Sequence, residues 1–211
     1  MRMVNKYDWY NEQWFQTMGP LYDVMEIFVR HIRTDVVKDS GLRRGSSVID
    51  LACGTGAQSI AFAKNGFPTV GVDLSPYMVA RAAEKVKAGW DARFVCHDAT
   101  QTPFSDSEFE LSTVSFGLHD MPETIGVAVL REMCRVTKRG GKLVIIDYSL
   151  PANRVSAAMG RMIAGIWEGE TYRYFLDKGL GHYLNKVDLT VAEDARYLFG
   201  NVQKVTCLND N

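Results

Sequence analysis

The sequence has few cysteines, almost no net charge and no long apolar run, and each shortage excludes a class of protein. Its four cysteines form no Cys-x-x-Cys pair and have no zinc-ligand spacing with histidine, so we expect no metal site. A formal net charge of -1 gives no global attraction to nucleic acid. No segment approaches about 18 consecutive apolar residues, so no transmembrane segment is expected.

The first residues are rich in Asp, Asn, Trp and Tyr and lack the apolar core of a signal peptide. Single, scattered thiols are typical of a reducing compartment, so we expect a cytoplasmic protein. Peripheral contact with a membrane surface stays open. A length of 211 residues suits one α/β domain with a sizeable core.

The most informative stretch is residues 48–56, Val-Ile-Asp-Leu-Ala-Cys-Gly-Thr-Gly, an apolar run that breaks into glycines before a helix. Such a strand–turn–helix binds nucleotide-like cofactors. The dinucleotide fingerprint needs a third glycine where this chain has Ser59. Asp50 favours a ligand with positive charge over a pyrophosphate, and S-adenosylmethionine carries an ammonium and a sulfonium. A tight turn without a ligand is the alternative.

Strands and helices alternate between residues 47 and 148, which predicts a doubly wound, mostly parallel sheet with helices on both faces. The expected strands are 48–51, 69–73, 92–96, 110–115 and 142–148, and the expected helices are 57–64, 76–88 and 123–137.

We expect a single domain, 1–211, whose parts are an N-terminal arm and helix (1–40), a cofactor-binding core (41–150), a helical lid (151–189) and a terminal helix and strand (190–211). The lid has two expected helices, 156–167 and 171–178, which either pack on the sheet or cover a substrate pocket. Thr190 and Glu193 form a capping box, which predicts a short helix before a last strand at 202–208.

Acids close the second and third expected strands. Asp73, followed by Leu74, lies where an acid after the glycine loop binds ribose hydroxyls. Its alternative role is a helix cap, for which Ser75 is better placed. Asp98 suits an adenine amino group and the Ala99 N–H suits a ring nitrogen, whereas the alternative for Asp98 is a surface turn.

His119 and Asp120 follow the fourth expected strand. A histidine there is a candidate general base, with an unperturbed pKa of about 6.5. The alternative is that His119 is a polar wall of the pocket and Asp120 caps the next helix. We therefore name His119 and Asp120 as candidate catalytic residues.

In this order, the motifs resemble those of the class I S-adenosylmethionine-dependent methyltransferases, within them the ubiquinone/menaquinone-biosynthesis C-methyltransferase group. The resemblance covers about residues 20–205. It rests on the stretches 50–56, 72–73, 98–99, 103–106, 115–118 (Ser-Phe-Gly-Leu), 130–136 and 140–143.

The resemblance implies a Rossmann-like fold, S-adenosylmethionine as the methyl donor and S-adenosylhomocysteine as the product. The candidate cofactor-binding residues are Asp50, Gly54, Thr55, Gly56, Asp73, Leu74, Asp98, Ala99, Ser115 and, from a Tyr-Asp pair, Tyr22. The chain departs from the group in three ways. His119-Asp120 replaces the usual Arg-Asn, the N-terminal arm is unusually aromatic, and only one strand of the usual last hairpin is recognisable. We therefore expect the last strand to be missing, with an altered edge or a homodimer contact there.

The expected function is methyl transfer to a small aromatic or lipophilic acceptor, for example C-methylation of a quinol-like compound. N-methylation of an amine or of a phospholipid head group, and a non-catalytic S-adenosylmethionine-binding protein, are the alternatives. A nicotinamide oxidoreductase is disfavoured by Ser59 and Asp50.

Overall fold

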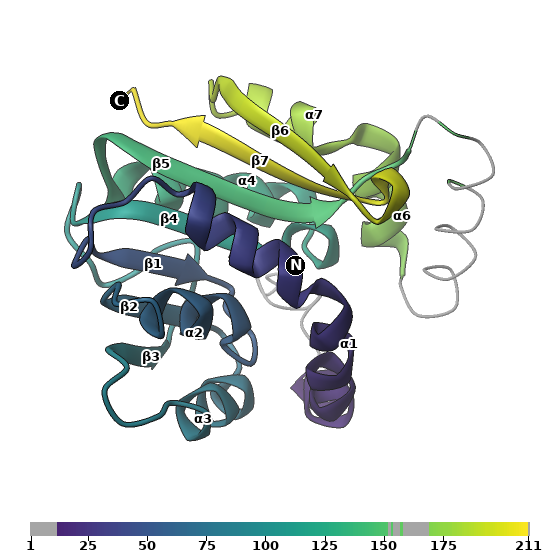
Figure 1. Cartoon of the computed structure of the whole chain (residues 1–211). Coiled ribbons are helices and arrows are strands. Elements are labelled where there is room, and N and C mark those ends of the chain that lie inside the picture. The colour runs from purple at the N-terminus through teal and green to yellow at the C-terminus, as the bar shows by residue number, and fades with distance from the viewer. Residues whose placement is uncertain (1–11, 152, 154–156, 158–168, 211) are drawn as a thin grey trace, which may run out of the picture.

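The computed structural model describes residues 12–151, 153, 157 and 169–210. They include a seven-stranded sheet with the order β3-β2-β1-β4-β5-β7-β6 (Figure 1). Its strands are β1 (Val48–Leu51), β2 (Thr69–Asp73), β3 (Ala92–Cys96), β4 (Phe109–Ser115), β5 (Thr137–Tyr148), β6 (Val191–Tyr197) and β7 (Val202–Leu208). β1 to β5 are parallel and β7 is antiparallel to its neighbours, which confirms the predicted doubly wound, mostly parallel sheet.

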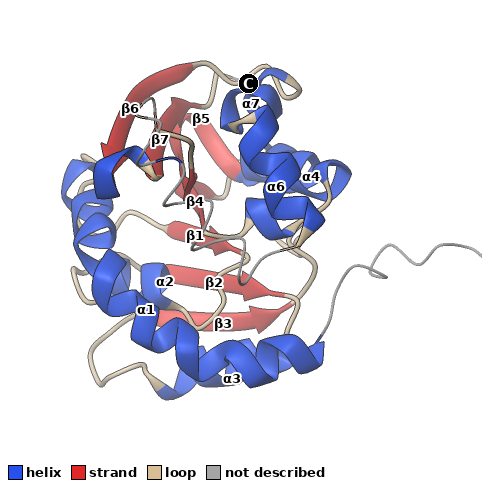
Figure 2. Ribbon diagram, turned by 90° about the vertical axis from the view of Figure 1, so that its right-hand side faces the viewer, coloured by secondary structure: helices blue, strands red, loops and turns tan. Residues whose placement is uncertain are grey.

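Helices cover both faces of the sheet (Figure 2). One face carries α1 (Glu12–Asp39), which packs on α2 (Ala57–Ala63) and α3 (Pro76–Glu84). The other face carries α4 (Glu123–Val136), α6 (Glu170–Lys178) and α7 (Leu180–Asn185). Two short 3₁₀ turns, η1 (Leu118–Asp120) and η2 (Leu198–Gly200), follow β4 and β6.

Successive strand residues point to opposite faces, so the sheet divides the core into two layers. Val48 packs with Ile32 of α1 and Phe62 of α2, whereas Ile49 packs with Met133 of α4. All five side chains come from elements that the sequence predicts, and all are fully buried. Each contributes about 1.5–3 kcal/mol through burial, which fixes the strand ends that carry the polar residues.

The structure corrects the sequence prediction at the C-terminal end. Residues 191–197 form β6, not the expected helix, and pair with β7 from Tyr197–Val202 to Val191–Cys207. The prediction of a missing last strand is therefore wrong, and the argument for a homodimer contact at that edge lapses. Pairing with β7 satisfies backbone groups along the strand, which outweighs the local capping pattern.

The segment 151–189, expected to be a helical lid, is described only in part. The expected helix at 171–178 is confirmed as α6, and α7 was not predicted. The expected helix at 156–167 lies outside the described residues.

Gly140 and Gly141 lie inside β5, at a register shift against β4, instead of preceding the strand. None of the helices in the described ranges combines the length and apolarity needed to cross a membrane.

Candidate functional site

The predicted site positions lie at the carboxyl ends of neighbouring strands. Asp73 ends β2, Asp98 follows β3, Ser115 ends β4, and the loop 52–56 follows β1. These parallel strands are adjacent, so the four positions share one edge of the sheet. Ligands of open α/β sheets bind outside the carboxyl ends where the strand order reverses, which here is between β1 and β4.

The two glycines of the loop serve different purposes, although both have left-handed backbones, with φ of +53° at Gly54 and +78° at Gly56. A Cβ at Gly54 would meet nothing within 4 Å, so the backbone there leaves room for a ligand. A Cβ at Gly56 would lie 2.7 Å from the Phe94 ring and 2.8 Å from Ala82. Gly56 therefore permits close packing of the loop on β3 and α3.

Asp50 is fully buried beneath this loop. Its Oδ2 accepts hydrogen bonds from the Ser59 backbone N–H (3.0 Å) and hydroxyl (2.6 Å), while Oδ1 has no partner in the described part of the chain. Burial raises the pKa of Asp50 to about 6, against the opposing effects of the Ser59 hydrogen bonds and the Arg33 charge. An ionised carboxylate in this position would favour a cationic ligand, and the contact of Asp50 with a cofactor stays a prediction.

Asp73 ties the glycine loop to β2. Its Oδ2 accepts a hydrogen bond from the Gly54 N–H at 2.7 Å, and its Oδ1 accepts one from the Ser75 N–H at 2.9 Å. Leu74 lies between Asp73 and Ser75 in the chain. Ser75 caps α3 by accepting from the Met78 N–H at 3.1 Å, as the sequence predicts. Asp73 therefore lies beside the glycine loop, and its contact with ribose hydroxyls stays a prediction.

Asp98 and the buried Ala99 open the segment after β3. Asp98 Oδ1 accepts from the Thr100 N–H at 2.9 Å and from the Thr100 hydroxyl at 2.8 Å. This is the turn-stabilising arrangement that the sequence offered as the alternative. It also fixes where the carboxyl group lies beside Ala99, so the adenine contact stays a prediction that this geometry permits.

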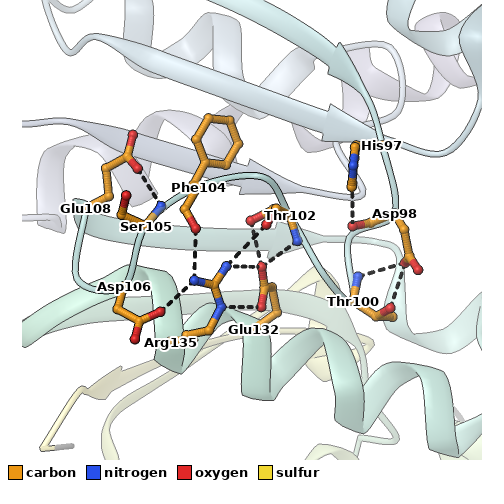
Figure 3. Close-up of polar contacts among 10 residues, drawn as sticks. All are labelled: His97, Asp98, Thr100, Thr102, Phe104, Ser105, Asp106, Glu108, Glu132 and Arg135. Atoms are coloured by element: carbon orange, nitrogen blue, oxygen red, sulfur yellow. Dashed lines mark hydrogen bonds and ion pairs between the residues drawn. The ribbon is translucent and has the colours of Figure 1, made fainter.

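A charged network from α4 holds the rest of this segment (Figure 3). Glu132 Oε1 accepts from the Thr102 N–H and hydroxyl, both at 2.6 Å. Arg135 donates to Glu132 at 2.7 Å, to the Phe104 carbonyl at 2.9 Å and to Asp106 at 2.7 Å. These contacts anchor the segment that carries Asp98 to the helix behind it.

A second network fastens α1 to the loop. Asp23 pairs with Arg81 of α3 and with Lys85, the residue after α3, and Lys85 Nζ donates to the Thr55 carbonyl at 3.0 Å. Burial raises the pKa of Asp23, but the hydrogen bonds from Lys85 and Arg81 outweigh it and the pKa is lowered. Tyr22 lies in α1, one residue before Asp23; its side chain is outside the described part of the structure.

Ser115 meets a residue that sequence analysis missed. Its hydroxyl accepts a hydrogen bond from Arg33 Nη1 of α1 at 2.8 Å, and Arg33 Nε donates to Glu26 at 2.6 Å. The guanidinium carbon lies 5.6 Å from the centre of the Phe116 ring. In the sequence, Arg33 is simply one polar position beside the apolar stripe of a helix, so nothing there marks it.

His119 lies in a carboxylate–imidazole pair. Its Nδ1 is 2.7 Å from Oδ1 of Asp147, at the end of β5, and Asp147 also accepts from the Leu118 N–H (3.0 Å) and the Tyr148 N–H (2.8 Å). A carboxylate is a hydrogen-bond acceptor and not a donor. The fully buried Asp147 therefore favours the tautomer of His119 that has its proton on Nδ1. On the other side of the ring, Nε2 is 3.4 Å from Asp120 Oδ1.

The surroundings of this pair are aromatic. The His119 ring packs edge-on against Tyr148 (4.8 Å between ring centres) and Tyr172 (5.5 Å), and it is only 4% exposed. The Asp120 side chain is 35% exposed. Burial and the charge of Asp147 raise the pKa of Asp120, against the effect of His119. Asp120 does not cap α4, whose N-cap position is Pro122 and has no side-chain cap, so that alternative is wrong.

Sequence analysis also missed Asp147, although a usable signal exists. Like Asp73, it is an acid that closes an apolar strand, Leu-Val-Ile-Ile-Asp.

Among the described residues no group of three or more His, Cys, Asp or Glu side chains is arranged to hold a metal ion.

Comparison with known proteins identifies a methyltransferase family. Residues 9–177 match the ubiE/COQ5 methyltransferase family, which confirms the resemblance seen in the motifs. A demethylmenaquinone methyltransferase of Staphylococcus aureus (strain JH9) is 36% identical over 145 residues, which cover 65% of this chain and 59% of that protein.

Two solved structures share the fold. An S-adenosylmethionine-dependent methyltransferase from Aquifex aeolicus is 21% identical, with a TM-score of 0.64 over 83% of this chain and 88% of that one. The magnesium protoporphyrin IX methyltransferase of Synechocystis PCC 6803, solved with bound S-adenosylhomocysteine, is 19% identical, with a TM-score of 0.65 over 87% of this chain and 83% of that one.

Proposed function

The chain belongs to the ubiE/COQ5 methyltransferase family, and we propose that it transfers a methyl group from S-adenosylmethionine to a small aromatic or lipophilic acceptor. The observation that carries this proposal is the shared edge of the sheet. Asp73, Asp98, Ser115 and the open side of Gly54 lie along it. The pair of His119 and Asp147 lies at the same edge, beyond β4 and β5.

The residues present fit this cofactor. Asp73 and the segment at Asp98 suit an adenosine, and the buried Asp50 beneath the loop favours a ligand with positive charge. A pyrophosphate would face the same carboxylates with like charge. When bound, S-adenosylmethionine supplies a methyl group activated on its sulfonium; the protein supplies position and a proton acceptor.

For a carbon acceptor, the acceptor must lose the proton that the methyl group replaces. We assign that proton to the pair of Asp120 and His119, with Asp147 as the positioning residue that fixes the imidazole. Asp120 is the more exposed member and meets the acceptor, and His119 stabilises its charge from behind. A buried imidazole between two carboxylates is well placed for this, because the imidazolium form gains a partner on each side.

The aromatic side chains around His119 support a flat, apolar acceptor. The relative from Staphylococcus aureus bears the name of an enzyme acting on demethylmenaquinone, which favours a quinol-like compound and C-methylation here too. The aligned part spans 59% of that protein, so the acceptor is assigned as a class.

Calorimetry and a transfer assay test the proposal. Purified protein is titrated with S-adenosylhomocysteine and with NAD, then incubated with methyl-labelled S-adenosylmethionine and a short-chain naphthoquinol. We expect binding of S-adenosylhomocysteine but not NAD, and label in the naphthoquinol ring. Binding of NAD alone would overturn the proposal. Tight S-adenosylhomocysteine binding with no transfer to any quinol, amine or phospholipid would identify a binding protein.

The His119→Gln variant tests the proton-accepting pair of Asp120 and His119. We expect turnover to fall about 10²- to 10⁴-fold, the usual contribution of a general base, while S-adenosylhomocysteine affinity changes less than about twofold. His182→Gln, on α7 and away from β4, is the matched control and keeps full turnover. Unchanged turnover in His119→Gln would show that His119 is only a wall of the pocket.

A further inference from the structure

The pair of His119 and Asp147 is covered by α6 in this structure. The His119 ring is 4% exposed, and Tyr172 and Phe175 of α6 pack on it, with 5.5 and 6.5 Å between ring centres. Asp147 is fully buried, so only Asp120 of the proposed proton-transfer residues reaches the surface. Of the described elements that touch the ring, β5 lies within the sheet and η1 carries His119 itself. α6 is therefore the element that can move aside to admit a molecule to the imidazole.

One carboxylate outside this core joins α6 to α4 and α7. Glu123, the first residue of α4, accepts a hydrogen bond from the Tyr174 hydroxyl of α6. It also lies 2.7 Å from Nζ of Lys186, the C-cap residue of α7, whereas His182 Nε2 lies farther away, at 3.3 Å. The hydrogen bonds from Lys186 and Tyr174 lower the pKa of Glu123 to about 2, so its carboxylate is charged at neutral pH. We call Glu123, Tyr174 and Lys186 the Glu123 cluster.

The Glu123 cluster is exposed, whereas the inner contacts of α6 are apolar. The Lys186 side chain is 43% exposed and Tyr174 is 41% exposed, and exposed ion pairs shift an equilibrium by about fivefold at most. On its inner side, α6 buries Tyr172, Phe175 and Leu176 beside η1 and α7 (Figure 2). The closed position is therefore the dominant one, and the cluster adds a small share of its stability that can be lost and regained at the surface.

Glycines lie at both ends of α6. Gly169 is its N-cap residue, and Gly179 separates α6 from α7 with a φ of +74°. A Cβ at either position would meet nothing within 4 Å, so packing does not confine the backbone there. Hinges at the ends of an element absorb the changes in φ and ψ when the cover of a site opens.

We propose that Glu123 is a positioning residue, which holds α6 closed over the pair of His119 and Asp147 and whose release lets α6 move aside for the acceptor. This inference rests on the proposed function, since it presumes that the acceptor reacts beside His119. Glu123 acts on the reacting groups through α6 and Tyr172, not by contact. Closure keeps water from the imidazole while it is paired with Asp147.

Chemical modification of histidine measures the opening of α6 without any ligand. Diethyl pyrocarbonate adds an ethoxycarbonyl group to an unprotonated imidazole nitrogen, and mass spectrometry of peptides gives the rate at each histidine of the whole protein. Because the closed state dominates, the rate at His119 follows the opening equilibrium. The exposed His31 and His97 are internal references. We expect Glu123→Gln to raise the His119 rate about 3- to 10-fold and to change the two reference rates less than about 1.5-fold.

Two further substitutions locate the effect. Tyr174→Phe keeps the ring and removes the hydroxyl, so it should also raise the His119 rate. Combined with Glu123→Gln, it should add less than its single effect, because both changes weaken the same contact. Glu108→Gln, at the amino end of β4 and away from α6, is the matched control and should leave the His119 rate unchanged.

An unchanged His119 rate in Glu123→Gln would overturn the proposal. A parallel rise at His31 and His97 would overturn it as well, because it would mean that the whole protein is loosened and not α6 alone.

The entry of the acceptor has its own test. With S-adenosylhomocysteine present, a short-chain naphthoquinol should slow the modification of His119 in the unaltered protein, because the bound acceptor lies beside the ring. If the protein methylates the naphthoquinol and the modification is not slowed, the acceptor does not enter under α6 and the inference is wrong. If Glu123→Gln speeds the modification as expected and no acceptor is methylated, the proposed function fails, and the cover of His119 by α6 stands.

Discussion

Gly56→Ala should be among the most destabilising single substitutions in the loop, for reasons that can be separated by experiment. Gly56 has a φ of +78°, and a left-handed alanine costs about 1–2 kcal/mol. The added Cβ would also lie 2.7 Å from the Phe94 ring and 2.8 Å from the Ala82 Cβ. Overpacking of this kind costs about 1–3 kcal/mol, for a total of about 2–5 kcal/mol.

Neither neighbour can retreat easily. Ala82 is fully buried on α3, so moving its Cβ means moving the helix. The Phe94 ring also covers Gly71 of β2, where a Cβ would lie 2.5 Å from it. The ring is therefore confined between two glycines, and the clash is not relieved by a small rotation.

Gly89→Ala is the matched control. Gly89 has a φ of +85° and is exposed, and a Cβ there meets nothing within 4 Å, so only the backbone cost of about 1–2 kcal/mol applies. Urea unfolding without ligand measures both variants. We expect Gly56→Ala to lose about 1–3 kcal/mol more than Gly89→Ala, at an unchanged denaturant slope. Equal losses would refute the packing role of Gly56.

Gly54→Ala separates packing from binding in the same assay. Its backbone is also left-handed and its Cβ would project into open space, so its stability loss should match that of Gly89→Ala. Calorimetry should then show weaker S-adenosylhomocysteine binding for Gly54→Ala and none of that weakening for Gly89→Ala. Equal affinity in both would show that the open side of Gly54 is not used by the ligand.

Two predictions concern buried carboxylates. Glu132→Gln places an amide donor against Arg135, and we expect a loss of about 2 kcal/mol in urea unfolding together with weaker S-adenosylhomocysteine binding, because the segment at Asp98 loses its anchor. Intact affinity would uncouple that segment from the site. The pKa of Asp50, raised to about 6 by burial, gives folding stability that is present below about pH 4 and lost as pH rises through 6. Relative to Asp50→Asn, which keeps an acceptor for Ser59, the protein should therefore lose up to about 3 kcal/mol between pH 4 and 7.5, and parallel pH curves would contradict this.

The central sheet could be predicted because its strands are apolar runs between clear breaks. β1, β2 and β3 begin and end where the sequence indicates. β6 could not, because Val-Ala-Glu-Asp-Ala-Arg-Tyr has little strand propensity, its side chains are mostly exposed, and a capping box precedes it. Its structure comes from pairing with β7, an interaction outside the local pattern.

Some residues of the candidate site could likewise be predicted from the sequence, and others could not. Acids that end apolar strands, such as Asp73, could be found from their place after a run, and Asp147 follows the same rule. The partners could not, because they lie far apart in the chain. Arg33 reaches Ser115 over 82 positions and His119 reaches Asp147 over 28, and no periodicity within one element links such residues.

Ser59 bears on the choice of cofactor in two ways, through the glycine that it replaces and through its hydrogen bonds to Asp50. In the sequence, Ser59 matters as the absence of a third glycine, which disfavours a dinucleotide. In the structure, both its N–H and its hydroxyl donate to the buried Asp50. A glycine there would remove the hydroxyl donor and leave the carboxylate less well solvated, which shifts it toward its neutral form. Ser59 therefore helps to maintain negative charge beneath the loop, and such a charge would repel a pyrophosphate and favour a sulfonium. The residue that departs from the dinucleotide pattern and the charge that favours a cationic cofactor are thus parts of one interaction.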